Sequence, residues 1–289
     1  MNTIHQLIKQ NRPNIAESSI KTYVFSLKKL GIIDEDDIYK IRNPNGIFDQ
    51  IADMKVSQQR NLLSSVLIII KAKELGDAIY DIYRAKCMEL NEEYNVEQSM
   101  NIKSETQKEN WVKMSELIDI ANAKFKKNPA SQDTMIASLY TKQPPSRLDY
   151  YDCKIVRSEA ELNDTKNFLL IHNTRRKEFI FNDYKTSNKY ETMRVPVTKE
   201  LNRVINKFLK LNPDREFLLQ SKKGKHLSRN LLGKLIPRTF EATGKHVTLN
   251  IIRHVYISEK IDIDAIKSCK EMASNMMHSD FMQLNYAKH

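Results

Sequence analysis

The sequence has few cysteines and no long apolar run, and both absences exclude classes of protein. Its three cysteines, Cys87, Cys153 and Cys269, lie far apart and form neither a CxxC pair nor a zinc-ligand spacing. We expect them to be buried, reduced thiols. The longest apolar run, residues 66–70, is far too short to cross a membrane, and the first residues contain no apolar signal core. We therefore expect an intracellular protein with no membrane partner, no metal and no other cofactor.

Composition and charge indicate a globular protein with a polyanionic partner. The chain has 289 residues, 40% hydrophobic and 29% charged, which suits two folded domains better than one. The net charge of +11 is unevenly placed: residues 1–100 carry a net charge of −1, and residues 101–289 carry +12. A basic domain beside a neutral one favours nucleic acid as the partner, although charge alone says nothing about chemistry.

The first 95 residues show only helical periodicity. Apolar residues recur at Ile20, Tyr23, Val24 and Leu27, and Gly31 follows as a stop signal. No stretch alternates with a period of two, so a bundle of four or five helices is the natural interpretation. The sequence predicts helices at about 18–30, 34–41, 46–54, 57–76 and 77–94.

The rest of the chain changes in character along its length. Residues 96–106 are polar and aperiodic, as in a linker. A helix is predicted at 108–127, with Trp111 as a core anchor. Strands are predicted at 153–156, 168–172, 177–182 and 192–197, followed by helices at 198–210, 229–242, 248–259, 263–273 and 280–288. The fold class is therefore mainly α with a small antiparallel sheet (α+β), in domains 1–95 and 107–289 joined by the linker 96–106.

Five residues of the second domain stand in an order that indicates chemistry. Arg147 lies where helices give way to strands, and Lys185 lies in the turn-like run 183–188 between two predicted strands. Arg253 follows in Leu-Asn-Ile-Ile-Arg-His, His278 in Met-Met-His-Ser, and Tyr286 in Leu-Asn-Tyr. Each motif alone is weak, but the ordered set is fairly specific.

This ordered set resembles the tyrosine recombinases, or phage-type integrases, whose catalytic domain is shared with type IB topoisomerases. The resemblance covers residues 107–289 by motif order. It implies that residues 1–95 form a helical, SAM-like core-binding domain, and that the two domains clamp duplex DNA. It also implies that Tyr286 forms a 3′-phosphotyrosyl bond, which conserves the bond energy so that rejoining needs neither ATP nor metal.

The chemistry of these residue types suits that activity. Guanidinium groups are permanently charged and donate in a fork, so Arg147 and Arg253 suit the charge that develops on a phosphodiester under attack. A cationic pocket favours the ionised form of Tyr286, whose hydroxyl is otherwise a poor nucleophile. Lys185 can protonate the leaving 5′-oxygen as a general acid, and His278 can donate a hydrogen bond to the same phosphate.

The sequence departs from the family pattern in three places. Asn250 stands where His or Lys is usual, and an amide cannot carry a proton. Tyr150 stands where an acidic residue is expected, so we expect Asp149 or Asp152 to take that supporting part. His278 lies eight residues before Tyr286, one short of the commoner spacing. Only three residues follow Tyr286, and we therefore expect the assembly interface elsewhere in the chain.

Each candidate also has a purely structural alternative. Arg147 could cap a helix C-terminus, and Lys185 could be a solvated hairpin charge. His278 could be a core histidine, and Tyr286 could merely dock the C-terminus. Arg253 lies among Ile251, Ile252 and Val255, where burying its charge is costly unless an anion is present.

We therefore expect a site-specific recombinase that integrates or excises a viral or mobile element, a source that the Ile-, Lys- and Asn-rich composition fits. Its partners would be double-stranded DNA and copies of itself, as a homo-tetramer on paired sites and a monomer or dimer when free. It would act in the host cytoplasm or nucleus. A type IB topoisomerase is the nearest alternative, although its viral form begins with a β-rich domain. A second alternative, which Asn250 favours, is a DNA-binding regulator that has lost catalysis. A third is a plain basic scaffold without any activity on DNA.

Overall fold

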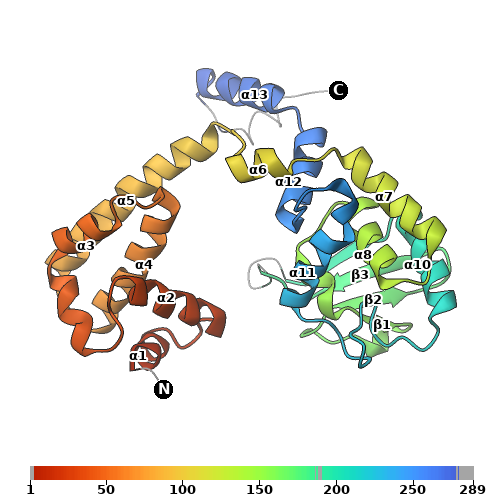
Figure 1. The fold of residues 1–289 in the computed structure, drawn as a ribbon, viewed down its shortest axis with the longest axis horizontal. Coiled ribbons are helices and arrows are strands. Elements are labelled where there is room, and N and C mark those ends of the chain that lie inside the picture. Colours follow the sequence, from red (N-terminus) through yellow and green to blue (C-terminus); the bar gives the residue numbers. More distant parts are fainter. Residues whose placement is uncertain (1–2, 186, 188–190, 278, 280–289) are drawn as a thin grey trace. The chain divides into compact units, whose positions relative to one another are not determined.

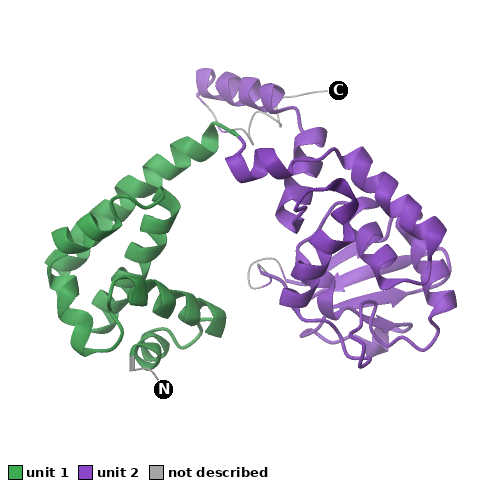
Figure 2. Cartoon of the chain, in the orientation of Figure 1, with its two compact units in different colours: residues 1–102 green, residues 103–289 purple. Residues whose placement is uncertain are grey.

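The computed structural model describes residues 3–185, 187, 191–277 and 279. The chain divides into two compact units, unit 1 at Met1–Ile102 and unit 2 at Lys103–His289 (Figure 2). Each unit has a hydrophobic core of its own. No helix among the described residues is both long and apolar enough to span a membrane.

The described residues of unit 1 form helices joined by loops. Its elements are α1 (Thr3–Asn11), α2 (Glu17–Lys29), the 3-10 helix η1 (Asp36–Arg42), α3 (Pro44–Ile51), α4 (Val56–Ala72) and α5 (Asp77–Ser99) (Figure 1). The apolar residues of α4 are buried on most sides, and this helix packs against α1, α2 and α5. Tyr83 is fully buried on α5 and donates its hydroxyl to the carbonyl of Ile41 at 3.0 Å. The unit is thus a bundle around a central helix, as the periodicity predicts.

Two features at the ends of unit 1 differ from the sequence prediction. Helix α1 was not predicted, although Ile4 and Ile8 on it are buried. Helix α5 continues to Ser99, and α6 (Glu105–Asn110) begins soon after, so much of the expected linker 96–106 is helical. The last turns of α5 are exposed on every side, and a helix without a buried face has no apolar period to detect. Ser104 begins α6 with a capping box to Gln107.

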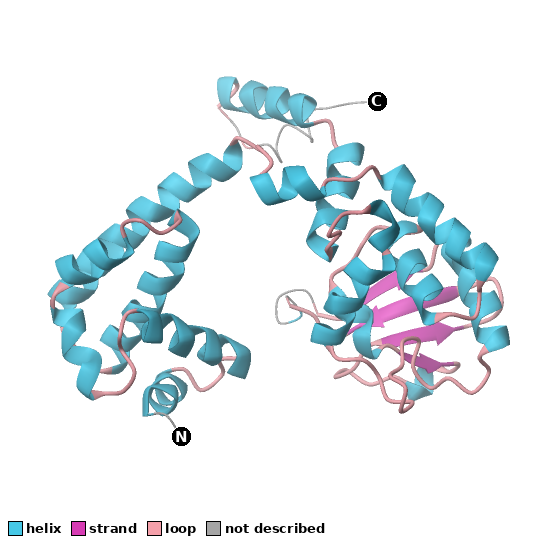
Figure 3. Ribbon diagram, viewed as in Figure 1, coloured by secondary structure: helices cyan, strands magenta, loops and turns pink. Residues whose placement is uncertain are grey.

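Unit 2 places a small sheet among helices (Figure 3). Its helices are α6, α7 (Met114–Lys127), α8 (Gln132–Thr141), α10 (Lys199–Leu211), α11 (Arg229–Thr239), α12 (Leu249–Lys260) and α13 (Ile263–Asn275), with 3-10 helices η2 (Leu148–Asp152), η3 (Glu159–Glu161) and η4 (Glu241–Thr243). Its strands are β1 (Lys154–Val156), β2 (Phe168–Ile171), β3 (Lys177–Phe181) and β4 (Met193–Pro196).

The sheet has the order β1-β2-β3-β4. Strands β2, β3 and β4 are antiparallel neighbours, but β1 runs parallel to β2. The sheet is therefore mixed rather than wholly antiparallel. The connection 157–167 returns the chain to the end of the sheet where β1 began, so β2 runs in the same direction as β1. Four strands lie where the sequence predicts them, and β3 and β4 form the expected hairpin that carries Lys185.

The core of unit 2 lies between the sheet and α8, a helix that is buried at every position from 134 to 141. Tyr140 on α8, Tyr150 on η2 and Phe179 on β3 pack edge to face at 4.8–5.6 Å between ring centroids. Such aromatic contacts fix the 3-10 turn η2 against the sheet. The expected α+β fold class, mainly helical with a small sheet, is confirmed.

Four expectations need correction or lie outside the described residues. The helix predicted at 108–127 is two helices that break at Trp111, whose carbonyl accepts a hydrogen bond from the ammonium of Lys245. Trp111 is only partly buried against the core. Cys269 is exposed, whereas Cys87 and Cys153 are buried and free as expected. The helix predicted at 280–288 lies outside the described residues.

Candidate active site

Arg147 lies at the start of the 3-10 turn η2. Its backbone is extended, and its carbonyl accepts a hydrogen bond at 3.3 Å from the hydroxyl of Tyr140, which is fully buried. The side chain is exposed, and no described residue forms a hydrogen bond or an ion pair with its guanidinium. Helix α8 is capped by Lys142, so Arg147 does not serve as its C-cap. The fold therefore holds the backbone of Arg147 in place and leaves its charge available.

Lys185 lies in the connection between β3 and β4, as the sequence predicts. Its side chain is exposed, and it has no hydrogen-bonding or ion-pairing partner among the described residues. Position 185 follows Asp183 by two residues, and Asp183 is held firmly at the base of the hairpin. The fixed base and the free lysine together suit a cation that reaches toward a ligand.

Asp183 connects the hairpin to the 3-10 turn that follows Arg147. Its carboxylate accepts a hydrogen bond at 3.1 Å from the hydroxyl of Tyr151 on η2. Burial raises the pKa of Tyr151, so the hydroxyl stays protonated and keeps its role as donor. The same carboxylate lies 3.3 Å from the guanidinium of Arg229. Two chain segments far apart in sequence, those of Arg147 and Lys185, are therefore fastened to one another.

Arg229 is the central cation of this arrangement, and the sequence analysis missed it. It is the first residue of α11 and reaches Asp149 at 3.6 Å and Asp183 at 3.3 Å, with its guanidinium 5.2 Å from the ring centre of Tyr151. A cation at a helix N-terminus faces the positive end of the helix dipole, so it needs carboxylates nearby. That unfavourable position directly after the cap residue Ser228 was the available signal.

Asn167 fixes the same cluster from the sheet side. It is fully buried, and its amide group donates to the carbonyls of Asp149 and Asp183 and to the carboxylate of Asp152, at 3.0–3.1 Å. Its side-chain oxygen accepts from the backbone N–H groups of Asn182 and Asp183 at 2.9 and 3.0 Å. A single amide thus joins η2 to the end of β3, and the register of the two segments is fixed.

Two carboxylates, the buried Asp149 and the partly buried Asp152, support the cluster. Burial raises the pKa of Asp149, an effect opposed by the charges of Arg229 and then Arg147. Burial likewise raises the pKa of Asp152. Tyr150, at the position where the family has an acidic residue, is a core side chain between Tyr140 and Phe179. Asp149 pairs with Arg229, while Arg147 remains unpaired among the described residues, so neither Asp149 nor Asp152 forms an ion pair with Arg147 there.

Arg253 and Asn250 lie on α12, which begins after Thr248 caps the N–H of Ile251. Ile251, Ile252 and Val255 are buried, as the apolar pattern predicts. Asn250 is exposed and Arg253 is partly buried, and neither side chain has a hydrogen-bonding partner among the described residues. Helix α11 contacts η2, which follows Arg147, and α12, which carries Arg253. Its first residue, Arg229, pairs with Asp183 in the hairpin of Lys185. All three candidate residues therefore lie on segments that contact α11.

The structure brings together only part of the predicted set. Arg147, Lys185 and Arg253 are described, and no hydrogen bond or ion pair joins them. His278 and Tyr286 lie outside the described residues. Within the described ranges, no group of three or more His, Cys, Asp or Glu side chains could hold a metal ion. The described part of the site can bind an anion. Arg147, Lys185 and Arg253 have no carboxylate partners among the described residues, and the Asp183–Arg229 cluster and helix α11 connect the segments that carry them.

Comparisons with known proteins give structural likeness without sequence likeness. No family model matches the chain, and no curated protein matches its sequence significantly. The chain is similar to a crystal structure of XerA recombinase, with 12% identity and a TM-score of 0.37, over 99% of this chain and 93% of that one. It is also similar to lambda integrase (residues 75-356) bound to DNA, with 14% identity and a TM-score of 0.49, over 89% and 87%. For a dimer of lambda integrase(75-356) bound to a COC' core site, the identity is 13% and the TM-score 0.49, over 99% of this chain and 95% of that one.

Proposed function

We propose that this chain is a DNA strand transferase of the tyrosine recombinase type, which cleaves and rejoins double-stranded DNA through a 3′-phosphotyrosyl bond at Tyr286. The observation that supports this most strongly is the hydrogen bond between Tyr151 and Asp183, with Arg229 beside both. This hydrogen bond shows that the segments of Arg147 and Lys185, which are far apart in the sequence, are neighbours in the fold. Two of the five candidate residues, Arg147 and Lys185, flank that connection.

Charge pairing within the cluster supports the same assignment. Asp149 and Asp183 both form ion pairs with Arg229, and neither forms one with Arg147. The exposed guanidinium of Arg147 therefore has no ion pair among the described residues to break before it contacts a phosphate. Losing one preorganised donor of this kind costs roughly 10²–10³ in rate. The arrangement therefore suits binding of a phosphodiester whose negative charge grows during reaction.

The reaction assigns one role to each residue. Arg147 and Arg253 donate to the non-bridging oxygens, with His278 as a further donor. The phenolate of Tyr286 attacks phosphorus, the bond from phosphorus to the 5′-oxygen breaks, and Lys185 gives that oxygen its proton. Asn250 can donate a hydrogen bond to the phosphate but cannot shuttle a proton. In this scheme the only proton donor to the leaving group is Lys185.

We also propose an assembly and a biological role for this activity. Four copies would act on paired DNA sites and exchange strands to integrate or excise a viral or mobile element, within the cytoplasm or nucleus of a host. The net charge of +12 on residues 101–289 supports a polyanion as the partner, because a basic domain raises the local concentration of DNA and its rate of association.

A covalent-trapping assay tests the proposal. Nicked duplexes that cover the ends of the genetic element encoding the protein are incubated with the wild type and with Tyr286→Phe, without metal or ATP. Adducts that resist SDS are then scored. We expect an adduct with the wild type that disappears in the variant. DNA binding without any adduct would favour a non-catalytic regulator, and an adduct that persists in Tyr286→Phe would identify another nucleophile.

A further inference from the structure

Helix α10 lies on the opposite side of unit 2 from α11 (Figure 1). Its exposed side carries a stripe of cations. We define the α10 stripe as Arg175, Lys199, Arg203, Lys207 and Lys210. These residues line a groove of about 500 Å³ together with Thr174, Asn202 and Asn206. Neither an acidic nor an apolar side chain lines this groove. The stripe shares no residue with the candidate active site.

The helical period explains why these cations share one face. Positions 199, 203, 207 and 210 follow the spacing i, i+4, i+8 and i+11, which keeps side chains on one side of a helix. The opposite side consists of Leu201, Val204, Ile205 and Phe208, all buried in the core. Eleven residues of helix span roughly 16 Å. Along that length one strand of duplex DNA presents about five phosphates.

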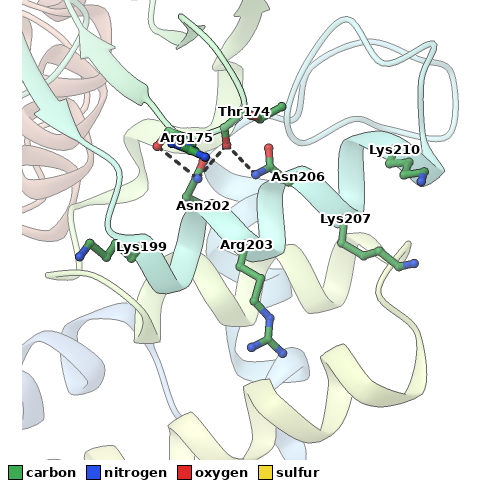
Figure 4. Close-up of a pocket in the computed structure, with 8 residues that line it drawn as sticks. All are labelled: Thr174, Arg175, Lys199, Asn202, Arg203, Asn206, Lys207 and Lys210. Atoms are coloured by element: carbon green, nitrogen blue, oxygen red, sulfur yellow. Dashed lines mark hydrogen bonds between the residues drawn. The ribbon is translucent and has the colours of Figure 1, made fainter.

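The turn that carries Arg175 is fixed onto α10 by hydrogen bonds. The amides of Asn202 and Asn206 donate to the carbonyl of Thr174 at 3.0 and 2.7 Å, and that of Asn202 also donates to the carbonyl of Arg175 at 3.3 Å (Figure 4). Figure 4 shows both asparagines pointing toward the turn, while Lys199, Arg203 and Lys207 extend away from it. Arg175 is therefore held beside the helix.

A buried ammonium below the turn adds positive charge that no carboxylate compensates. Lys177 is 3% exposed, and its Nζ contacts the side-chain oxygens of Asn202 and Asn206 at 2.7 and 2.6 Å and the carbonyls of Asn173 and Thr174 at 3.4 and 3.2 Å. All four partners are neutral oxygens. A buried charge of this kind is felt at the nearby surface because little solvent screens it.

The cations of the stripe are not neutralised within the described part of the chain. Glu200 is the only carboxylate on α10, and it forms no ion pair with any of the five. Arg203 lies over the ring of Phe125 at 5.6 Å and does not meet a carboxylate. The neighbouring Lys142 has a lowered pKa because of burial and then the charge of Arg203. The positive potential of this face is thus available to a partner.

We infer that the α10 stripe is a second, sequence-independent contact for the phosphate backbone of nucleic acid, separate from the candidate active site. Lysine, arginine and threonine are among the side chains that proteins use to contact phosphates. A protein segment would need apolar anchors as well, and the groove offers none. A molecule with both surfaces can hold one duplex at the candidate active site and a second on α10. The inference rests on the proposed DNA partner but not on the chemistry of Tyr286.

A two-duplex capture experiment with the full chain tests this inference. The protein is saturated with an immobilised duplex, and a fluorescent duplex of random sequence is then added. The triple variant Lys199→Gln, Arg203→Gln, Lys207→Gln should capture the second duplex more weakly while its affinity for the first is unchanged. Because each phosphate contact contributes about 1 to the dependence of log affinity on log salt, the slope for the second duplex should fall by about 3.

A matched control separates the stripe from bulk charge. Lys222→Gln, Lys223→Gln, Lys225→Gln removes three exposed charges from a turn and should leave capture and slope unchanged. Equal losses in both triple variants, or none in the α10 variant, would overturn the inference. Loss of poly-glutamate binding with intact DNA capture would instead assign the stripe to an acidic protein. Covalent adducts are scored in parallel, and a wild type that captures two duplexes without forming adducts would contradict only the proposed activity.

Discussion

The hydroxyl of Tyr151 donates to the carboxylate of Asp183 at 3.1 Å, and this bond joins the turn after Arg147 to the hairpin that carries Lys185. Arg229 lies against both residues, and Asn167 binds both segments through their backbones. Networks of this kind fix geometry because each member has several partners. Replacing a member of this network should therefore change the positions of Arg147 and Lys185 without removing their charges.

Replacing Arg147 or Arg253 should slow cleavage strongly without abolishing DNA binding. Arg147→Lys and Arg253→Lys keep the charge but lose the fork of donors, so we expect the rate of adduct formation to fall by roughly 10²–10³. The measurement is single-turnover adduct formation on nicked duplexes, with affinity measured separately. Arg157→Lys, at another exposed arginine without an ion pair, is the matched control. A rate loss of the same size in that control would remove the special role of the two arginines.

Replacing Lys185 should slow cleavage in a way that depends on the leaving group. Lys185→Ala removes the proposed general acid, and general acid catalysis contributes typically 10²–10⁴-fold. A substrate whose 5′-oxygen is replaced by sulfur has a leaving group that needs no protonation, so the variant should cleave it nearly as fast as the wild type does. Lys225→Ala, in an exposed turn, should behave as the wild type on both substrates. An equal defect on both substrates would show that Lys185 is not the acid.

Asp183→Asn should act through Lys185 rather than on the DNA itself. The amide keeps the size of the side chain but loses the charge that pairs with Arg229, so the base of the hairpin is held less firmly. Misplacement of a reacting group by about 1 Å can cost up to about 10²-fold. We expect a defect of this order with the oxygen substrate and little with the sulfur substrate.

The double variant Asp183→Asn, Lys185→Ala completes that test, because residues acting as one unit are not additive. Its rate should match that of Lys185→Ala alone. Multiplied defects would mean that Asp183 acts independently of the lysine.

The buried carboxyl of Asp149 should give stability an identifiable pH dependence. Burial raises its pKa in the folded state, so the native protein holds this proton to higher pH than the unfolded chain, whose aspartates titrate near about 3.9. The contribution to wild-type stability is thus present below that value and is lost as the pH rises through the folded pKa. Relative to the wild type, Asp149→Asn should gain free energy of unfolding over the same window, as measured by urea denaturation.

Glu159→Gln provides the contrasting variant. The hydrogen bond from Arg194 lowers the pKa of Glu159, so the wild type gains stability as that carboxyl ionises. The relative stability of this variant should fall as the pH rises, which is the opposite sign. Parallel trends in the two variants would contradict the assignment of the pKa shifts.

The sequence by itself determined the elements and the identities of the candidate residues. Short apolar runs bounded by turn signals located the four strands and the β3–β4 hairpin, and helical periods located α10 to α13 closely. Helical periods failed where burial leaves no period: the exposed end of α5 showed no apolar face, and α8, buried at every position from 134 to 141, showed no exposed side over those residues. The parallel pairing of β1 depends on where the chain returns, which no local pattern records.

Only the tertiary structure decided which charges remain free. In the sequence, Arg147 and Arg229 are similar basic residues, and Asp149 and Asp183 are similar acidic ones. Folding brings Arg229 between the two carboxylates and leaves Arg147 and Lys185 without partners among the described residues. Ion pairing depends on distances of a few ångströms between residues far apart in the chain, and such distances exist only after the segments have packed.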